Sequence, residues 1–240
     1  MLPTMQRPTQ RPVPDLSCLT PRTRQIRLAA RWEQARRNPE EFLRWFVWTM
    51  DAHDKARPVK RFPWERPHLR AVTQLWLHNP LLSICKSRQM LMTWLFAALC
   101  LWDALHPGQF IVMQSKRLDD AIGNEAVGDG PLGRAKFILH HIPGQAMLGL
   151  VEGWDYVCTS AEITFPRLNS AILAMPQGGN IVRQRTPSGI LSDESQYQEE
   201  FEAAYTAARP CIRGGGWFVS LSTANPGAAN DLHNDKLGDR

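Results

Sequence analysis

The hydrophobic pattern of the first eighty residues predicts helices. Apolar positions recur every three or four residues from about residue 23, again over residues 39–50, and over residues 68–78, as they do on one face of an amphipathic helix. The sequence NPEE at 38–41 is typical of a helix start, because asparagine caps free N–H groups and acidic side chains suit the positive end of the helix dipole. We therefore expect a helical subdomain over residues 24–79.

Two stretches lack this periodicity. Residues 1–23 contain five prolines and predict an extended or disordered arm. Residues 51–67 are polar and rich in proline, so they predict a loop within the helical subdomain.

Beyond residue 80, short apolar runs alternate with helical segments. The predicted strands are 81–85, 110–114, 156–165, 171–175, 181–184, 189–192 and 217–221, and the predicted helices are about 90–105, 118–127 and 199–208. Strands that alternate with helices in this order predict crossover connections between parallel strands. We expect residues 80–240 to form an α/β core with a mostly parallel sheet flanked by helices.

Composition and charge narrow the class of protein. An apolar content of 43% with 21% charged residues predicts a folded chain rather than a disordered one. Five cysteines without CxxC spacing predict reduced thiols. The longest apolar run, 90–102, is too short to span a membrane, and no signal peptide is evident. The net charge is +8 over residues 1–70 and −3 over the remainder, which suits either contact with a polyanion or a solvated basic face.

The turn after the strand at 81–85 has the position of a phosphate-binding loop. Compared with the pattern GxxxxGK[ST], only Thr93 matches; Lys86 stands at the first glycine, Leu91 at the second and Met92 at the lysine. A helix that begins after such a turn can bind phosphate through its free N–H groups, although an ordinary strand–helix turn has the same pattern. The candidate phosphate-binding residues are Lys86, Ser87, Arg88, Gln89, Met90, Leu91, Met92 and Thr93.

Two further segments place polar side chains at predicted strand ends. Asp193 and Glu194 follow the strand at 189–192, where a first carboxylate can hold Mg²⁺ and a second can act as a general base; an acidic helix cap would look similar. The strand at 217–221 is followed by the polar turn STANP. Because ligands bind at the carboxyl ends of parallel strands, we expect all three segments to meet at one edge of the sheet.

These segments together resemble the ATPase domain of the large terminase subunit of tailed bacteriophages, over about residues 40–230. KSRQMLMT resembles the family's deviant P-loop, ILSDE its Walker B segment and STANP its coupling motif. RFPWERPHLRAVTQLW is similar to its adenine-binding region, and QSKRLDDA to the segment that follows the P-loop.

The resemblance implies a RecA-like P-loop fold with an additional strand and a catalytic glutamate, which uses ATP and Mg²⁺. It also implies a motor that moves double-stranded viral DNA into a procapsid. The implied partners are the portal protein, the small terminase subunit and other copies of the chain in a ring on the portal; the isolated chain would be a monomer. The implied location is the host cytoplasm, without membrane contact.

The resemblance also implies roles for individual residues. Lys86 would bind phosphate, Thr93 and Asp193 would ligate Mg²⁺, Glu194 would activate water, and Arg88 would contact phosphate during catalysis. The implied coupling residues are Ser222, Thr223 and Asn225, the adenine contacts Phe62, Pro63 and Gln74, and the candidates for an arginine that acts on a neighbouring subunit Arg134, Arg183 and Arg185.

Departures from the P-loop pattern carry their own prediction. Leu91 lacks the conformational freedom of glycine, and Met92 lacks the usual ammonium group, so we expect weak nucleotide binding by the isolated chain. His140 and His141 lack the spacing of a metal site and are expected to have surface or core roles.

Two alternative functions are compatible with the same segments. The first is a helicase-like ATPase that remodels nucleic acid, and the second is a degenerate P-loop domain that only docks onto a partner. STANP ends 14 residues before Arg240, so we expect this chain to contain the motor domain without a nuclease domain and to have no intrinsic DNA-cleaving activity.

Overall fold

A seven-stranded sheet organises the structure, a computed structural model that describes residues 20–51, 53–178 and 186–223. Its strand order is β3-β9-β8-β4-β7-β6-β5. In chain order the strands are β3 Leu81–Lys86, β4 Phe110–Ser115, β5 Val157–Cys158, β6 Glu162–Phe165, β7 Ser170–Pro176, β8 Gly189–Asp193 and β9 Trp217–Thr223. The neighbouring strands β3, β9, β8, β4 and β7 pair in parallel. At the far edge, β6 pairs antiparallel with β7 and β5 pairs antiparallel with β6. This confirms the predicted mostly parallel α/β fold.

The position of β9 matches the additional strand that the resemblance implied. β9 pairs with β3 on one side and with β8 on the other, so it separates the strand before the loop from the strand that carries the acidic pair. One strand prediction was wrong: 156–165 forms two short antiparallel strands, because the chain turns at Thr159, whose N–H donates to the carbonyl of Glu162. The strand predicted at 181–184 lies outside the described residues.

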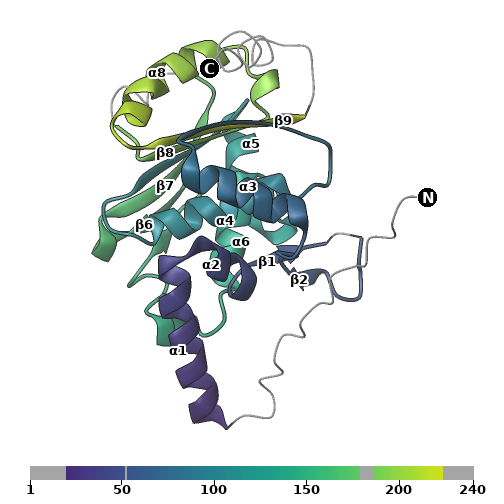
Figure 1. Cartoon of the computed structure of the whole chain (residues 1–240), viewed down its shortest axis with the longest axis vertical. Coiled ribbons are helices and arrows are strands. Elements are labelled where there is room, and N and C mark those ends of the chain that lie inside the picture. Colours follow the sequence, from purple (N-terminus) through teal and green to yellow (C-terminus); the bar gives the residue numbers. More distant parts are fainter. Residues whose placement is uncertain (1–19, 52, 179–185, 224–240) are drawn as a thin grey trace, which may run out of the picture.

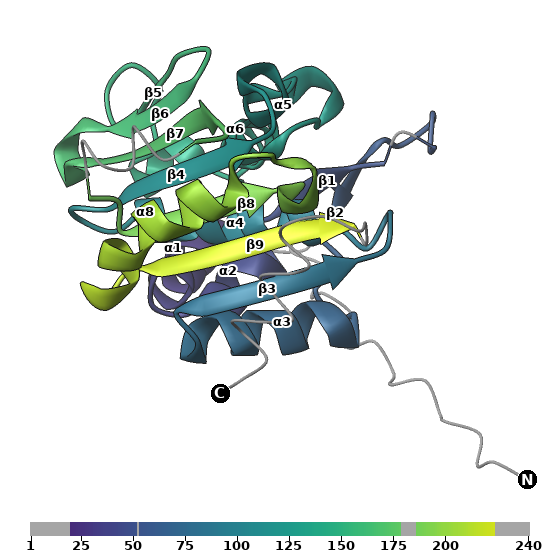
Figure 2. The same cartoon turned by 90° about the horizontal axis from the view of Figure 1, so that it is seen from above.

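Helices cover both faces of the sheet (Figures 1 and 2). Their bounds are α1 Pro21–Arg37, α2 Pro39–Trp45, α3 Pro67–His78, α4 Met92–Ala104, α5 Leu118–Ile122, α6 Pro131–His140 and α8 Phe201–Arg213, and the short 3₁₀ turns are η2 Glu125–Val127, η3 Gln145–Leu148, η4 Pro166–Leu168 and η5 Ser195–Tyr197. Helix α8 covers one face of the sheet, and α3, α4 and α6 cover the other. Nearly every residue of α4 is buried, as its uniformly apolar sequence predicts.

The amino-terminal helices share the hydrophobic core of the sheet. Trp32 of α1 packs edge-on against Phe46, with ring centroids 4.9 Å apart. The indole N–H of Trp102 in α4 donates to the carbonyl of Ala35 at 2.7 Å. Because these helices and α4 bury side chains in one cluster, the boundary predicted at residue 79 does not divide the core. Helix α1 begins at Pro21 with Thr20 as its cap, slightly before the predicted end of the arm.

The prediction of a loop over residues 51–67 was wrong in part. β2 Val59–Arg61 pairs antiparallel with β1 Trp48–Met50 and forms a hairpin. An isolated hairpin is marginally stable in water, and here β1 packs against α6. Lys60 also binds the carboxylates of Asp51 and Asp54 at 2.7 and 3.1 Å across the hairpin. The tertiary contacts of β1 and the local charges therefore outweigh the weak strand pattern of these residues.

None of the helices in the described ranges is long and apolar enough to cross a membrane.

Candidate active site at the carboxyl ends of three strands

The carboxyl ends of β3, β9 and β8 bring the three predicted segments together. Lys86, the last residue of β3, is paired with Thr223 at the end of β9. Asp193, the last residue of β8, is paired with Leu221 of β9. All three strands are parallel, so their polar ends lie at one edge of the sheet, where ligands bind in open α/β sheets. The predicted convergence of the three segments is therefore observed.

The loop between β3 and α4 has a backbone conformation that favours glycine. Gln89 and Leu91 have φ angles of 64° and 61°. Leu91 is the residue before α4, in the left-handed region with ψ 17°, and no side chain caps the helix there. A left-handed conformation costs a non-glycine residue about 1–2 kcal/mol. Leu91 thus adopts a conformation that glycine reaches easily and leucine does not. The first N–H groups of α4 donate no hydrogen bond to a capping side chain.

Lys86 is paired with the predicted Mg²⁺ ligand Asp193 and with the predicted general base Glu194. Its ammonium nitrogen lies 3.1 Å from Glu194 Oε1 and 4.0 Å from Asp193 Oδ1. Asp193 is buried, whereas the Glu194 side chain is 38% exposed and borders the pocket. Burial raises the pKa of the Asp193 carboxyl, although the positive charge of Lys86 opposes the rise. Glu194 also has a left-handed backbone, with φ 52° and ψ 40°, and its N–H donates to Asp193 Oδ1 at 3.1 Å.

The turn after Glu194 is hydrogen-bonded to the end of β9. The hydroxyl groups of Ser195 and Ser220 are hydrogen-bonded, with their oxygens 2.7 Å apart. The N–H of Gln196 donates to Ser222 Oγ at 3.3 Å. The hydroxyls of Tyr197 and Thr223 are 3.3 Å apart. Two predicted coupling residues, Ser222 and Thr223, therefore contact the segment that carries the acidic pair. The third, Asn225, lies outside the described residues.

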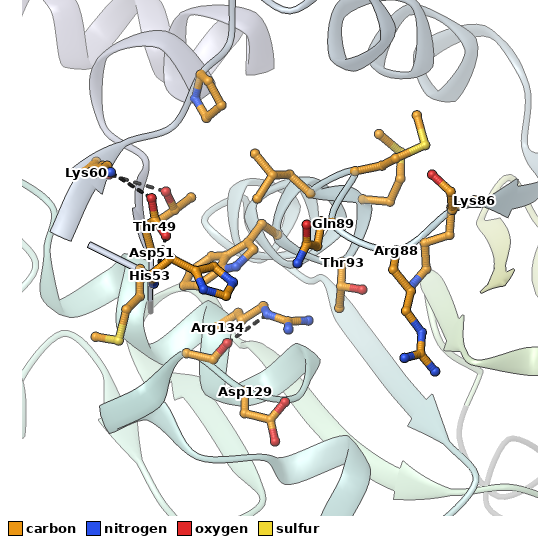
Figure 3. Close-up of a pocket in the computed structure, with 18 of the residues that line it drawn as sticks. Thr49, Asp51, His53, Lys60, Lys86, Arg88, Gln89, Thr93, Asp129 and Arg134 are labelled. Atoms are coloured by element: carbon orange, nitrogen blue, oxygen red, sulfur yellow. Dashed lines mark hydrogen bonds and ion pairs between the residues drawn. The ribbon is translucent and has the colours of Figure 1, made fainter. Parts of the chain in front are cut away.

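A pocket of about 910 Å³ opens in front of these strand ends (Figure 3). The loop from Lys86 to Thr93 forms one wall, and Glu194 and Thr223 also line the pocket. Asp193 and Ser222 are buried behind this lining.

The hairpin forms a second wall that the sequence did not predict. Thr49, Asp51, His53 and Lys60 line the pocket there. β1 ends at Met50, so Asp51 and His53 lie in the connection to β2, and no periodicity of the sequence would have placed them at the pocket.

Arg134 of α6 lines the same pocket, near Asp129 and Thr93 in Figure 3. Its Nε donates to the carbonyl of Gly128 at 2.9 Å, and its guanidinium lies 5.5 Å from the ring centre of Trp94. Burial lowers the pKa of the Arg134 guanidinium, while the charges of Asp193, Asp129 and Glu194 oppose the shift. Arg134 thus faces the pocket of its own chain. Arg183 and Arg185 lie outside the described residues.

The structure brings only one of the three expected adenine contacts to the pocket. Pro63 lines it. The Phe62 side chain is instead buried in the core, and the amide of Gln74 donates to Glu40 of α2. An aromatic ring and an amide both suit adenine. In this fold, however, Phe62 packs in the core and Gln74 connects α3 to α2.

The residues of the pocket fit a nucleoside triphosphate with Mg²⁺. Cavities that hold small molecules span about 300–1,000 Å³. Lys86, Arg88 and Arg134 supply positive charge for phosphates. The hydroxyl of Thr93, which lines the pocket, and the carboxylate of Asp193, which is buried behind the lining, carry the oxygen atoms that Mg²⁺ prefers as ligands. Among the described residues Lys86 is the ion-pair partner of Asp193, so a divalent cation bound there would take the place of Lys86 in compensating the charge of this carboxylate.

The sheet order and the loop before α4 define a P-loop-type α/β fold. The structure is similar to the crystal structure of the HK97 bacteriophage large terminase, with a TM-score of 0.57 and 15% identity over 90% of this chain. This confirms, at the level of the fold, the resemblance that the sequence segments predicted. The chain spans 41% of the length of that terminase.

Two further solved structures are less similar. Two structures of the Thermus phage P74-26 large terminase ATPase domain, one of them a point mutant, each match with a TM-score of 0.44 over 63% of this chain, at 10% and 11% identity. No model of a protein family matches the chain. No curated protein sequence matches it either.

Proposed function

We propose that this chain is the ATPase domain of a DNA-packaging motor and that it hydrolyses ATP to move double-stranded DNA into a viral procapsid. The observation that carries the proposal is the meeting of Lys86, Thr93 and Glu194 at one pocket, at the carboxyl ends of neighbouring parallel strands. The fold shared with the HK97 large terminase supports the motor class.

Lys86 and the amino end of α4 would bind the phosphates. The Lys86 ammonium is held by Glu194 at 3.1 Å, so phosphate oxygens would compete with this carboxylate for the same donor. Backbone N–H groups at the start of α4 lack partners within the helix and favour negative charge. Thr93 and Asp193 would hold Mg²⁺, which neutralises charge on the phosphate oxygens when it is bound.

Glu194 would act as the general base. Release of Lys86 leaves one carboxylate oxygen without its ion-pair partner, so it can accept a proton from the attacking water. Arg88 and Arg134 line the same pocket and supply positive charge for the transition state. Both arginines come from this chain.

Hydrolysis would be coupled to movement through the bonds between η5 and β9. Ser195, Gln196 and Tyr197 follow the general base directly and each bonds to β9. A movement of Glu194 would therefore be transmitted through these hydrogen bonds to Ser222 and Thr223, the first two residues of STANP.

The proposed assembly is a ring of copies on the portal protein, with the small terminase subunit as a further partner. In such a ring, Arg183 or Arg185 remains a candidate for an arginine that reaches a neighbouring subunit. The basic residues 1–70, with a net charge of +8, are candidates for contact with DNA phosphates.

A phosphate-release assay tests the proposal. The chain is incubated with ATP and Mg²⁺, with and without linear double-stranded DNA, with and without portal protein. We expect hydrolysis that double-stranded DNA stimulates. Stimulation by single-stranded DNA alone would indicate a helicase-like enzyme, and no hydrolysis in any assembled mixture would indicate a docking module.

A further inference from the structure

Three side chains with metal-binding atoms meet at the edge of the sheet opposite the pocket. His140 is the last residue of α6, Glu152 precedes β5, and Cys158 lies in β5. One ligand atom from each lies within 4.8 Å of the others. β5 is the last strand of the sheet and β3, which carries Lys86, is the first, and Figure 2 shows them at opposite sides. None of the three residues lines the pocket, so the cluster is separate from it.

The distances within the cluster suit one bound ion. Zn²⁺ bonds of about 2.0–2.3 Å in a tetrahedral arrangement place ligand atoms about 3.3–3.6 Å apart. His140 Nε2 lies 3.7 Å from Glu152 Oε2 and 4.0 Å from Cys158 Sγ. Side-chain movements of a few tenths of an ångström would close these two distances to those of a coordinated ion. The Glu152 carboxylate and the Cys158 thiol lie within 4.8 Å of each other and would approach by up to about 1 Å.

Glu125 orients the histidine toward the cluster. Its carboxylate is paired with Nδ1 of His140, and Nε2 on the other side of the ring faces Glu152 and Cys158. Metal-bound histidines commonly donate their other ring N–H to a carboxylate, which fixes the tautomer and the ring orientation.

The neighbouring ammonium group of Lys136 binds backbone carbonyls next to the cluster. Lys136 Nζ donates to the carbonyls of Thr159 and Ser160 at 2.6 and 2.8 Å. It holds the chain just after Cys158 in place, and no ion pair between Lys136 and Glu152 is found among the described residues.

We propose that His140, Glu152 and Cys158 form a binding site for a divalent transition-metal ion, with Zn²⁺ as the ligand that this donor set fits. One nitrogen, one carboxylate oxygen and one thiolate are typical of zinc. The Glu152 side chain is 55% exposed, so the fourth position is open to water. The bound ion would tie the end of α6 to β5. The spacing of the three ligands, twelve and six residues apart, matches no short metal motif, which is why the sequence predicted none.

Titration of the metal-free chain tests the site. The protein is stripped with a chelator, kept reduced, and titrated with Zn²⁺ by calorimetry and with Co²⁺ by absorption spectroscopy, where a cysteine ligand produces a charge-transfer band. We expect one equivalent to bind and the band to appear. Cys158→Ser should abolish the band, and Cys158→Ser and Glu152→Gln should each weaken Zn²⁺ binding at least tenfold. Glu125→Gln should weaken it by about 10–100-fold.

Two variants serve as matched controls. His141 is next to His140, but its Nδ1 contacts the carbonyl of Phe137 and its ring stacks on that residue. Cys85 is an exposed thiol of β3. His141→Gln and Cys85→Ser should therefore bind Zn²⁺ as the wild-type chain does.

Two results would overturn the proposal. One is the lack of a one-equivalent transition in the wild-type chain; the other is a transition that Cys158→Ser and Glu152→Gln leave unchanged. Glu152 is exposed, so its variant is expected to fold, and circular dichroism with a single unfolding transition checks this. None of these outcomes depends on ATP hydrolysis, so the proposal stands or falls separately from the proposed function.

Discussion

The ammonium group of Lys86 lies 3.1 Å from the carboxylate of Glu194, although the two residues are 108 positions apart in the chain. Lys86 ends β3, and Glu194 directly follows β8. β9 lies between these strands, so the Lys86 side chain crosses the end of β9 to reach the acid. Lys86 thus connects the loop between β3 and α4 to the proposed general base, and both residues can be tested separately.

Replacement of Glu194 by glutamine should separate binding from hydrolysis. Glutamine keeps the size and the hydrogen-bonding oxygen of glutamate but does not accept a proton. We expect Glu194→Gln to bind ATP and to lower kcat by about 10²–10⁴-fold, the usual contribution of a general base. Calorimetry and phosphate release measure the two effects. Glu199→Gln, at an exposed position nearby, is the control, and undiminished hydrolysis in Glu194→Gln would exclude its role as the base.

Replacement of Lys86 should weaken nucleotide binding itself. A hydrogen bond to a charged group contributes about 1.5–3 kcal/mol, so Lys86→Ala is expected to raise the Kd for ATP by about 10–100-fold. Met92 occupies the position of the usual P-loop lysine but is buried in the core, and Met92→Ala should change the Kd much less. Calorimetry that shows tight binding lost in Met92→Ala, but kept in Lys86→Ala, would contradict the assignment.

The left-handed backbone of Leu91 predicts an unusual order of stabilities. Leu91→Gly and Leu91→Ala both lose the side chain, but only glycine relieves the strain at φ 61°. We expect Leu91→Gly to be more stable than Leu91→Ala by about 1 kcal/mol in urea unfolding. At Met90, which is not among the residues with positive φ, the order should reverse by about 0.4–1 kcal/mol because glycine increases the entropy of the unfolded chain. If the alanine variant is more stable than the glycine variant at both positions, Leu91 is unstrained.

Arg134 is expected to act within its own chain, because it lines the pocket that Lys86 and Glu194 also line. Arg134→Gln should lower kcat by about 10²–10³-fold, as the loss of one transition-state donor does. When variant and wild-type chains are mixed, activity should fall in proportion to the fraction of variant. A steeper fall, with the variant inhibiting its wild-type neighbours, would instead place Arg134 in the pocket of the adjacent subunit.

Replacement of the buried Asp193 by asparagine should increase the stability of the chain at neutral pH but not at low pH. Burial raises its pKa in the folded chain, so the stability that this group contributes is fully present below its unfolded pKa of about 3.9 and is lost as the pH rises through the folded value. Without nucleotide or Mg²⁺, Asp193→Asn should be more stable than wild type at neutral pH, and the difference should shrink as the pH falls toward 4. Urea unfolding across this range measures it, and a difference that grows at low pH would contradict the assigned direction.

The sequence by itself determined the parallel strands that border the pocket and the residues at which they end. Apolar runs at 81–85, 189–192 and 217–221 stop at polar residues, and parallel strands place their carboxyl ends at one edge, so Lys86 and Asp193 could be placed together without coordinates. The helix that follows Lys86 was predictable for the same reason, since a uniformly apolar segment must be buried against the sheet. These are local patterns, and local burial decides them.

Only the tertiary structure decided which distant side chains complete the sites. The β1–β2 hairpin forms a wall of the pocket because β1 packs on α6, and Arg134 enters the pocket because Gly128 and Trp94 hold its guanidinium. Phe62 has the chemistry of an adenine contact, but its neighbours in the fold bury it in the core. The meeting of His140 with Cys158 likewise depends on how α6 and β5 pack. Residue type and spacing do not predict such contacts. The contacts depend on how elements that are distant in the chain pack together.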